Sequence, residues 1–261
     1  MRAKSRTIKR FLQISLPAYA LMLILVWFIM PGFNGCEPGN PWCLTMYWIT
    51  QSGGWVGSLI IVLIISSAFA FIPLHPRARI VAFFRTLLSL VVVLGSFAKL
   101  NESYIKSTFA ISRPSHQFII RQSGSKVNLD SIYLLVVPER QKFFRSVVDT
   151  DTVHFHSIDK MVLSHWIDEA GYSMPSGHTF NAFLLASMLS FSLYELNERR
   201  ITIWLYVPVI WAALVGLSRV VLGVHTSLDV TIGAALGLII SHGLLAIPAL
   251  NRLLIPARPK K

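Results

Sequence analysis

Six long apolar runs alternate with shorter polar segments along the chain. Each run is long enough to form a helix across the hydrocarbon core of a bilayer, which takes about 20 residues. The predicted spans are residues 11–30, 55–72, 80–103, 179–196, 201–217 and 228–247. The first run follows a basic N-terminus, as in a signal peptide, but it is longer than a signal peptide's apolar region and no small-x-small site follows it. We therefore expect it to be retained as the first transmembrane helix.

The longest polar segment, residues 104–172, separates the third span from the fourth. It is too polar to cross a bilayer and too long for a plain connection, so we expect a small, partly helical domain outside the membrane. The chain then divides into residues 1–103, with the N-terminal tail and spans one to three, residues 104–172, and residues 173–261, with spans four to six. Aromatic side chains in the loop after the first span predict a short interfacial helix at residues 45–51.

Composition strengthens the membrane assignment. Hydrophobic residues make up 54% of the 261 residues and charged residues 14%, whereas a soluble domain carries about 25% charged residues. The mean hydropathy is +0.58. A large membrane-embedded fraction is therefore expected.

The distribution of charge predicts the orientation of the chain. The net charge is +12, from 24 Lys and Arg against 12 Asp and Glu. The cations form no basic helix or recognised nucleic-acid module, so we expect no nucleic-acid partner. They gather at the N-terminus, in residues 75–79, in residues 197–200 and at the C-terminus. Six spans bring these four clusters to one side, which the positive-inside rule makes the cytoplasm.

The two cysteines, Cys36 and Cys43, share the short loop after the first span. The predicted topology places this loop on the outer side of the membrane. If that compartment is oxidising, a disulfide is favoured. Two free thiols, or a metal site that lacks its other ligands, are the alternatives.

Three polar motifs fall at the outer ends of the predicted spans. The first has Lys106 followed by Arg113 and Pro114, just after the third span. The second is Pro-Ser-Gly-His at residues 175–178, just before the fourth span. The third is Ser-Arg-x5-His-x3-Asp at residues 218–229, between the fifth and sixth spans. Because the topology brings all three to one face, we expect them to form one site.

His225 and Asp229 in the third motif are four residues apart, so they would lie on one face of a helix if the segment is helical. The carboxylate could then accept a hydrogen bond from one imidazole nitrogen. The other nitrogen would stay unprotonated, as a nucleophile or general base requires. Taken singly, Arg219 would be interpreted as a topology anchor, Asp229 as a helix cap and the Pro-Ser-Gly turn as an N-cap.

Lys-x6-Arg-Pro, Pro-Ser-Gly-His and Ser-Arg-x5-His-x3-Asp are the signature blocks of the type 2 phosphatidic acid phosphatase superfamily, which this chain resembles without a departure at a defining position. The resemblance implies a multi-pass enzyme of the bacterial inner membrane, with cytoplasmic termini and an active site that faces the periplasm. The expected fold is all-α, a six-span transmembrane helical bundle with a small, partly helical periplasmic insertion between spans three and four. The resemblance also assigns roles. His225 is the nucleophile that forms a phosphohistidine, Asp229 orients its ring, and His178 protonates the leaving group and then activates water.

The same motifs carry cations that suit a phosphomonoester, which bears nearly two negative charges. Lys106, Arg113 and Arg219 are candidate phosphate ligands, and the two arginines are planar forks that can bind phosphate oxygens in pairs. Ser176 and Gly177 open the fourth span, where backbone N–H groups and the helix dipole favour an anion. Together these residues form the expected substrate-binding set.

The motifs contain one carboxylate, Asp229, which is too few for a two-metal phosphatase site. We therefore expect neither a metal nor a cofactor. The leading hypothesis is a metal-independent lipid phosphatase whose substrate is a membrane phospholipid or a polyprenyl pyrophosphate. The resemblance indicates phosphatidylglycerophosphate as one substrate, with undecaprenyl pyrophosphate, phosphatidic acid and diacylglycerol pyrophosphate as others.

Other functions remain as alternatives. A lipid phosphotransferase could use the same phosphohistidine and pass the phosphate to an acceptor other than water. A non-catalytic lipid-binding or transport protein would need only the cations, so the intact His178, His225 and Asp229 argue against it. A vanadium-dependent oxidase could use the same cations, but such enzymes are typically soluble. The sequence predicts no oligomeric state.

The remaining histidines receive structural interpretations. We expect His75 and His242 on the cytoplasmic side or within the last span, and surface positions in the insertion for His116, His154 and His156. Two interpretations stay open for His165 and Trp166, which either line the entrance to the site or pack the insertion on the bilayer.

Overall fold

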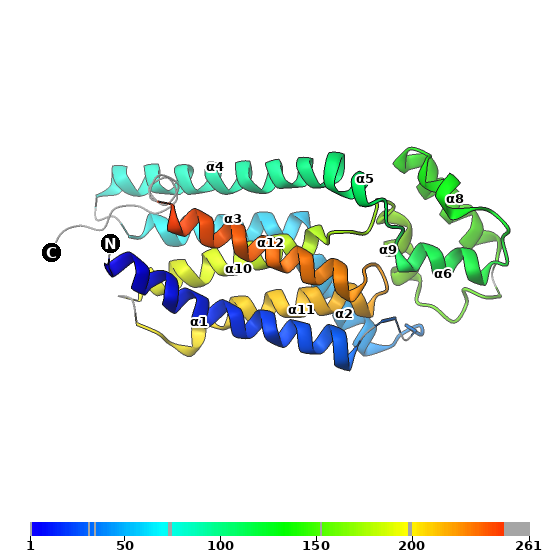
Figure 1. Cartoon of the computed structure of the whole chain (residues 1–261), viewed down its shortest axis with the longest axis horizontal. Helices are drawn as coiled ribbons and strands as arrows, with labels where there is room; N and C mark the ends of the chain where they lie inside the picture. The colour runs from blue at the N-terminus through cyan, green and yellow to red at the C-terminus, as the bar shows by residue number, and fades with distance from the viewer. Residues whose placement is uncertain are drawn as a thin grey trace.

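The computed structural model describes residues 2–30, 32–33, 35–72, 75–151, 153–197 and 200–247, and of residues 2–10 the backbone alone. The described residues form helices and no strand, which confirms the all-α prediction. The long helices lie side by side in one bundle (Figure 1). The helices of the bundle are α1 (Arg2–Ile24), α2 (Pro41–Ser52), α3 (Trp55–Ala70), α4 (Pro76–Leu100), α10 (Gly177–Leu196), α11 (Val207–Val221) and α12 (Ser227–Ala246).

Within the described residues, four stretches are long and apolar enough to cross a membrane. They are Phe11–Ile29, Pro76–Phe109, Ile203–Val221 and Ser227–Ala246. The helix pair α2 and α3, which is bent by 56°, adds a fifth if it counts as one span. The prediction of several membrane-spanning helices is therefore confirmed. By length and hydropathy the described residues contain four or five such spans, whereas the sequence predicted six.

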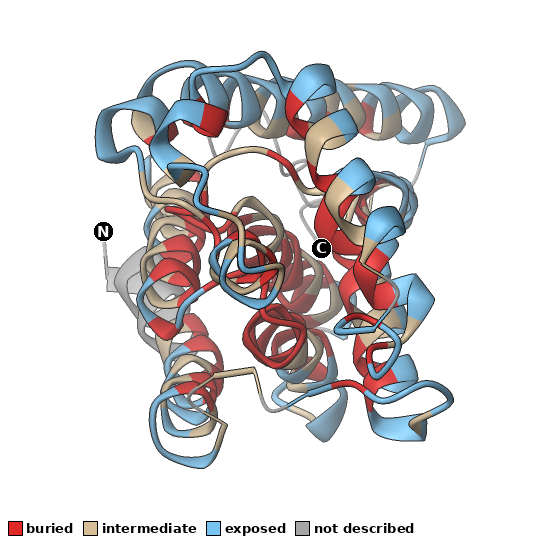
Figure 2. Ribbon diagram, turned by 90° about the vertical axis from the view of Figure 1, so that its right-hand side faces the viewer, coloured by how far each residue is buried: buried red, intermediate tan, exposed pale blue. Residues whose placement is uncertain are grey.

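Helix α10 lies at the centre of the bundle. It contacts α12, α11 and α3, and Figure 2 shows the buried residues concentrated on the inner helices. Polar side chains of α10 bond inside the protein: Ser190 Oγ donates to the carbonyl of Leu205 and Ser192 Oγ to that of Leu189. Because neighbouring helices surround α10, it needs no wide apolar face toward lipid. This position explains why α10 is not among the stretches that are apolar enough by themselves to cross a membrane.

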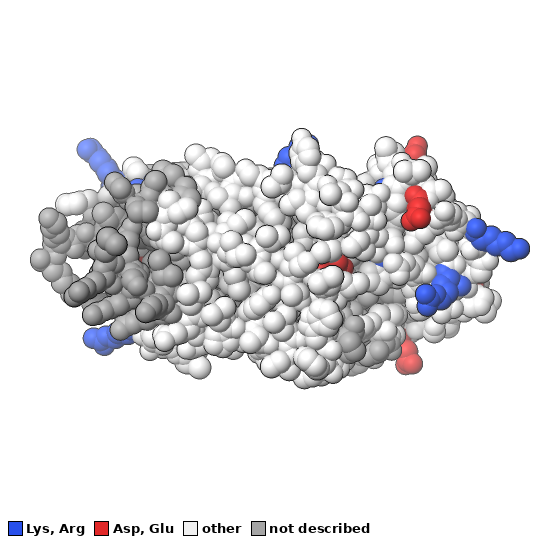
Figure 3. All heavy atoms as spheres, viewed as in Figure 1, with Lys and Arg blue, Asp and Glu red and all other residues white. Residues whose placement is uncertain are grey.

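The outer surface of the bundle is poor in charge. On the face that Figure 3 shows, few charged side chains lie over the middle of the molecule, and more gather at the right-hand end. Large apolar side chains point outward from α3 and α4, among them Ile60, Leu88 and Val92. A band of this kind can face lipid tails and supports a multi-pass membrane protein.

Two glycines of α12 allow its backbone to approach that of α10 closely. A Cβ at Gly233 would lie 2.5 Å from the carbonyl oxygen of Ser176, and a Cβ at Gly237 would lie 2.5 Å from that of Phe180. Beside this contact, the Ser176 N–H donates to the carbonyl of Asp229 over 3.0 Å. The close approach of the two helices therefore joins the second motif to the third.

The helix of the third predicted span runs past residue 103. A π-helical turn, Asn101–Ile105, connects α4 to α5 (Lys106–Phe109), so that one helical stretch extends from Pro76 to Phe109. Ala110 then takes a left-handed conformation, with φ of 48°, and ends the helix ahead of Arg113. Lys106 therefore lies at the end of a membrane-spanning stretch.

The insertion lies beyond the end of the bundle, at the right of Figure 1. Its helices are α6 (Pro114–Gln122), α7 (Leu129–Tyr133), α8 (Val137–Thr150) and α9 (Lys160–Asp168). The predicted disulfide between Cys36 and Cys43 is confirmed. The Asp159 N–H donates to the carbonyl of Cys36 over 2.7 Å, which ties the disulfide loop to the insertion. The helix expected at residues 45–51 is present within α2.

His116 is buried, so the prediction of a surface position for it is wrong. The Tyr133 hydroxyl donates to His116 Nδ1 over 2.6 Å, and His116 Nε2–H donates to the carbonyl of Trp166 over 3.0 Å. Burial lowers the pKa of His116 to about 3, so the ring is neutral. The polar sequence around it could not reveal partners that are distant along the chain. His154 and His156 are exposed, as predicted.

Replacing Gly233 with Ala should force α10 and α12 apart, because the added Cβ meets backbone rather than a movable side chain. We expect Gly233→Ala to lower the stability by about 1–3 kcal/mol, measured as thermal unfolding in detergent. Gly243→Ala in the same helix is the control, since its Cβ would meet nothing within 4 Å. Equal losses in the two variants would contradict this account of the helix contact.

Candidate functional site

Five of the predicted site residues line one cavity at the end of the bundle next to the insertion. The cavity has a volume of about 260 Å³, and its lining includes Lys106, Arg113, Gly177, His178 and His225. Lys106 begins α5, Arg113 is the N-cap of α6, and Gly177 and His178 open α10. His225 lies in the turn between α11 and α12. The structure therefore brings the three motifs together.

The other three predicted residues do not line this cavity but support it. Ser176 is the N-cap of α10, and its hydroxyl accepts from the Thr179 N–H. Asp229 lies in the first turn of α12. Arg219 is fully buried in α11 and contacts the cavity wall through Glu169. Five of the predicted residues therefore line the cavity, and the other three hold its walls in place.

Hydrogen bonds fix the proton position on His225. Arg113 Nη1 lies 3.0 Å from His225 Nε2, and a guanidinium can only donate, so Nε2 accepts and carries no proton. The proton is then on Nδ1, which lies 3.2 Å from Ser173 Oγ. Burial and the charge of Arg113 lower the pKa of His225 to about 3. His225 is therefore a neutral imidazole with its lone pair on Nε2, the form that a nucleophile needs.

Ser173 stands between His225 and Asp229. Its hydroxyl accepts from His225 Nδ1–H and donates to Asp229 Oδ2 over 2.6 Å, while Nδ1 itself lies 3.6 Å from Oδ2. The helical arrangement considered for this pair is not present, because α12 begins only at Ser227. The turn and Ser173 bring the two residues together instead. Asp229 also accepts from the Thr226 N–H over 2.7 Å, so it caps α12 as well.

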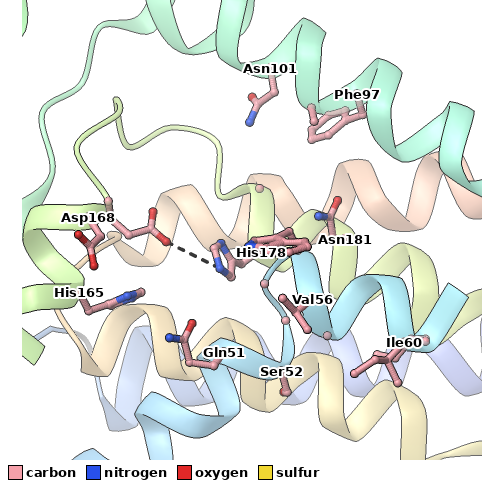
Figure 4. A pocket seen from close by; sticks show the side chains of 18 of the residues that line it. Gln51, Ser52, Val56, Ile60, Phe97, Asn101, His165, Asp168, His178 and Asn181 are labelled. Carbon is pink, nitrogen blue, oxygen red and sulfur yellow. Dashed lines mark ion pairs between the residues drawn. The ribbon is translucent and has the colours of Figure 1, made fainter. Parts of the chain in front are cut away.

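Glu169 occupies the centre of the cationic groups. Its Oε2 lies 2.9 Å from Arg113 Nη2, and its Oε1 lies 2.8 Å from Arg219 Nη2. His178 Nε2 is 3.7 Å from the same Oε1, the pair marked by the dashed line at His178 in Figure 4. Burial alone would raise the pKa of Glu169, but the charges of Arg219 and Arg113 outweigh burial and hold it well below its usual range. An ionised carboxylate therefore bridges two guanidinium groups.

Glu169 and Ser173 lie outside the three motifs, and neither was predicted from the sequence. The available signal was weak: Asp168 and Glu169 are the last acidic residues before the Pro-Ser-Gly-His block. Nothing in the sequence separates the two. In the fold both residues line the cavity, but Asp168 pairs with Arg145, at 3.9 Å, whereas Glu169 pairs with Arg113 and Arg219.

Lys106 is buried, and its Nζ forms an ion pair with Glu102, one turn earlier in the helix. Two carboxylates, Glu102 and Glu169, thus pair with the three cations of the site. Both carboxylates lie outside the motifs, whose one carboxylate is Asp229. Even so, the part of the chain that the structure describes contains no group of three or more His, Cys, Asp or Glu side chains placed to hold a metal ion.

The insertion fixes the segment that carries Glu169. Arg140 donates to the carbonyl oxygens of Ala170, Tyr133 and Leu135. Arg113 Nε donates to the carbonyl of Gly171 over 2.8 Å. Two guanidinium groups therefore hold consecutive carbonyls directly after Glu169, which restricts where its carboxylate can lie.

His165 and Trp166 prove to have different positions. Arg219 Nη1 donates to His165 Nε2 over 3.1 Å, and burial together with the charge of Arg219 lowers the pKa of His165 to about 4. His165 also lines a second cavity, in agreement with the first interpretation. Trp166 is fully buried, and its Nε1–H donates to the carbonyl of Leu222 over 2.6 Å. It packs the insertion on the turn before His225 rather than on lipid.

The second cavity, of about 1010 Å³, adjoins the first and shares Glu102, Asp168, Glu169, Gly177 and His178 with it. We call it the groove. It extends between the α2–α3 pair and α4, where Val56, Ile60 and Phe97 form apolar walls (Figure 4). Among the described residues, no Lys or Arg lines it. The groove therefore joins a charged pocket to an apolar channel.

The family model of the PAP2 superfamily matches residues 86–252, a range that contains all three motifs. The chain belongs to the PAP2 superfamily. This confirms the resemblance that the motifs predicted. The match also covers the insertion and the residues that support the cavity.

Three curated relatives of this chain share one name. The chain is 26% identical over 245 residues to phosphatidylglycerophosphatase B of Escherichia coli (strain K12), with 93% of this chain and 88% of that protein covered. It is 27% identical over 237 residues to phosphatidylglycerophosphatase B of Haemophilus influenzae, with 87% and 92% covered. A shorter match, 35% identical over 94 residues, is to phosphatidylglycerophosphatase B of Bacillus subtilis, with 30% and 46% covered.

Inorganic phosphate should stabilise the Glu169→Gln variant more than the wild type. In the wild type an incoming anion must displace an ionised carboxylate from Arg113 and Arg219, whereas a neutral amide competes weakly. Each tenfold gain in phosphate affinity adds about 1.4 kcal/mol of stabilisation at saturating phosphate, read as a larger rise in the unfolding temperature. Asp168→Asn is the control, because its carboxylate does not pair with either arginine. If phosphate raised the unfolding temperature of the wild type and of Glu169→Gln equally, this would contradict the account in which phosphate and the Glu169 carboxylate occupy the same position.

Proposed function

We propose that this protein is an integral-membrane lipid phosphatase that hydrolyses phosphatidylglycerophosphate. Its family and the name of its relatives support this function. The observation that carries the proposal is the position of Glu169, a carboxylate held by two guanidinium groups beside a neutral histidine. Undecaprenyl pyrophosphate, phosphatidic acid and diacylglycerol pyrophosphate carry the same terminal group and are further candidate substrates.

Substrate binding exchanges one anion for another. The terminal phosphate takes the place of the Glu169 carboxylate between Arg113 and Arg219, and both arginines then bind its oxygens as planar forks. Arg113 Nη1 moves from His225 to the phosphate, which frees the Nε2 lone pair. Gly177 leaves room on the α10 side, since the nearest atom to a Cβ there, Asn101 Nδ2, would be 3.7 Å away.

The first chemical step forms a phosphohistidine. His225 Nε2 attacks phosphorus, and the bond from phosphorus to the ester oxygen breaks. His178, which the charge of the bound phosphate holds protonated, gives its proton to the departing alkoxide. The His225 ring now carries positive charge, which Asp229 stabilises through Ser173 and its hydrogen bond to Nδ1–H.

The second step uses water. His178, now neutral, takes a proton from a water molecule as its oxygen attacks phosphorus. The P–N bond breaks, inorganic phosphate leaves, and Nε2 regains its lone pair. The cations Lys106, Arg113 and Arg219 stabilise charge through both steps, so the mechanism that we propose is independent of metal.

We further propose six membrane spans. They are the four stretches that are long and apolar enough, the bent pair α2–α3 counted as one span, and α10. The termini then lie in the cytoplasm and the site faces the periplasm of the bacterial inner membrane. The positions of the basic clusters support this orientation, because the cluster at residues 75–79 is at the end of α4 remote from the insertion (Figure 1). Lipid enters sideways through the groove, with its tails along the apolar walls.

Replacing His225 with Ala should abolish phosphate release while the protein still inserts and folds. Removing a covalent nucleophile costs on the order of 10⁴–10⁶ in kcat. The assay measures phosphate released from purified phosphatidylglycerophosphate, phosphatidic acid and polyprenyl pyrophosphates in detergent. The control is His154→Ala, since His154 is exposed in the insertion and pairs with Asp151.

Two outcomes would contradict this proposal. Retained activity in His225→Ala would exclude His225 as the nucleophile. Loss of wild-type activity in EDTA would show that a metal is required. Product analysis with candidate acceptors present separates hydrolysis from phosphotransfer, because a phosphotransferase would yield a phosphorylated acceptor.

A further inference from the structure

Asn101 is a buried polar residue that the mechanism above does not use. It begins the π-helical turn between α4 and α5, and the residue is 2% exposed. Within the described part of the chain its Oδ1 has no hydrogen-bond partner. Figure 4 shows the amide directed from its helix toward the groove, on the side opposite Gln51 and Ser52. Its Nδ2 lies toward Gly177, at the start of α10.

An unpaired amide in this position needs an explanation. Buried polar groups almost always have a partner, and leaving one without a partner costs free energy. A Leu side chain of similar volume would fit an apolar helix at no such cost. The arrangement is therefore explained if the partner arrives with the substrate.

The π-helical turn places Asn101 on the substrate side of its helix. In a regular α-helix, residues five apart are rotated by about 140° from each other. Here the Lys106 N–H donates to the carbonyl of Asn101, an i to i+5 bond that widens the turn and reduces this rotation. Asn101 and Lys106 are both buried as a result. Turns of this kind occur frequently at functional sites.

Asn101 lines the groove but not the cationic cavity. It is therefore placed beside the part of the substrate that follows the phosphate to be cleaved, not beside that phosphate itself. A second amide, Asn181, also lines the groove, from α10 (Figure 4).

We propose that Asn101 binds a hydroxyl group on the linker next to the cleaved phosphate, and that the site prefers phosphomonoesters of a glycerol-type linker over pyrophosphates. This inference rests on the proposed function and names the substrate class of the same site. A hydroxyl both donates and accepts, so it can satisfy Oδ1 and Nδ2 together. A pyrophosphate brings only acceptors and would leave Oδ1 unpaired. The free glycerol hydroxyl of phosphatidylglycerophosphate, between its two phosphates, has the required chemistry.

The test compares two substrates that differ by one hydroxyl. One is dioleoyl phosphatidylglycerophosphate, and the other is the analogue in which hydrogen replaces the hydroxyl of the headgroup glycerol. We expect the wild type to prefer the hydroxylated substrate by about tenfold in kcat/KM, the size of one hydrogen bond. Asn101→Leu should reduce this preference to less than about twofold, chiefly by lowering kcat/KM for the hydroxylated substrate.

Asn101→Ala serves as the second variant, in case Leu disturbs the contact between Phe97 and Phe180 one turn away. Unfolding temperatures in detergent check that both variants fold. An equal loss on both substrates, or a wild type without preference, would overturn the role of Asn101. A wild type that releases no phosphate from either substrate would instead overturn the proposed function.

Discussion

The ion pairs of Glu169 with Arg113 and Arg219 connect the parts of this molecule that its chemistry requires. Arg113 begins the insertion, Arg219 belongs to the bundle, and Glu169 follows the last helix of the insertion. Buried guanidinium groups without a counter-charge are strongly destabilising, so an empty site built from cations alone would be costly. Glu169 provides that counter-charge, with its side chain 17% exposed. In the proposed mechanism phosphate takes over this role, and the arginines are paired in both states.

The fold places these charges through backbone contacts. Gly233 lets α12 approach the start of α10, and the Ser176 N–H donates to the carbonyl of Asp229 at that point. The second and third motifs are therefore held in register by main-chain atoms. The insertion does the same for the segment after Glu169, because Arg140 binds the carbonyl of Ala170. Side chains that must move are thus attached to a backbone that is fixed.

The sequence predicted those features that depend on local pattern. Apolar runs predicted the helices, with bounds for α10 and α12 within two residues, and loop position predicted the disulfide. The motif blocks predicted the family. Features that depend on contacts between distant segments were out of reach. Glu169 could not be separated from Asp168, Ser173 carried no signal, and His116 looked like a surface residue. The π-helical turn that orients Asn101 has no pattern of its own, so the third span was expected to end too early.

The most direct test of this account is an experimental structure of the full-length protein with bound orthovanadate, an analogue of phosphate in transfer. The account predicts vanadium bonded to His225 Nε2, its oxygens bound by Arg113 and Arg219, and the Glu169 carboxylate displaced from between them. Vanadate bound elsewhere, with Glu169 still bridging the two arginines, would contradict it.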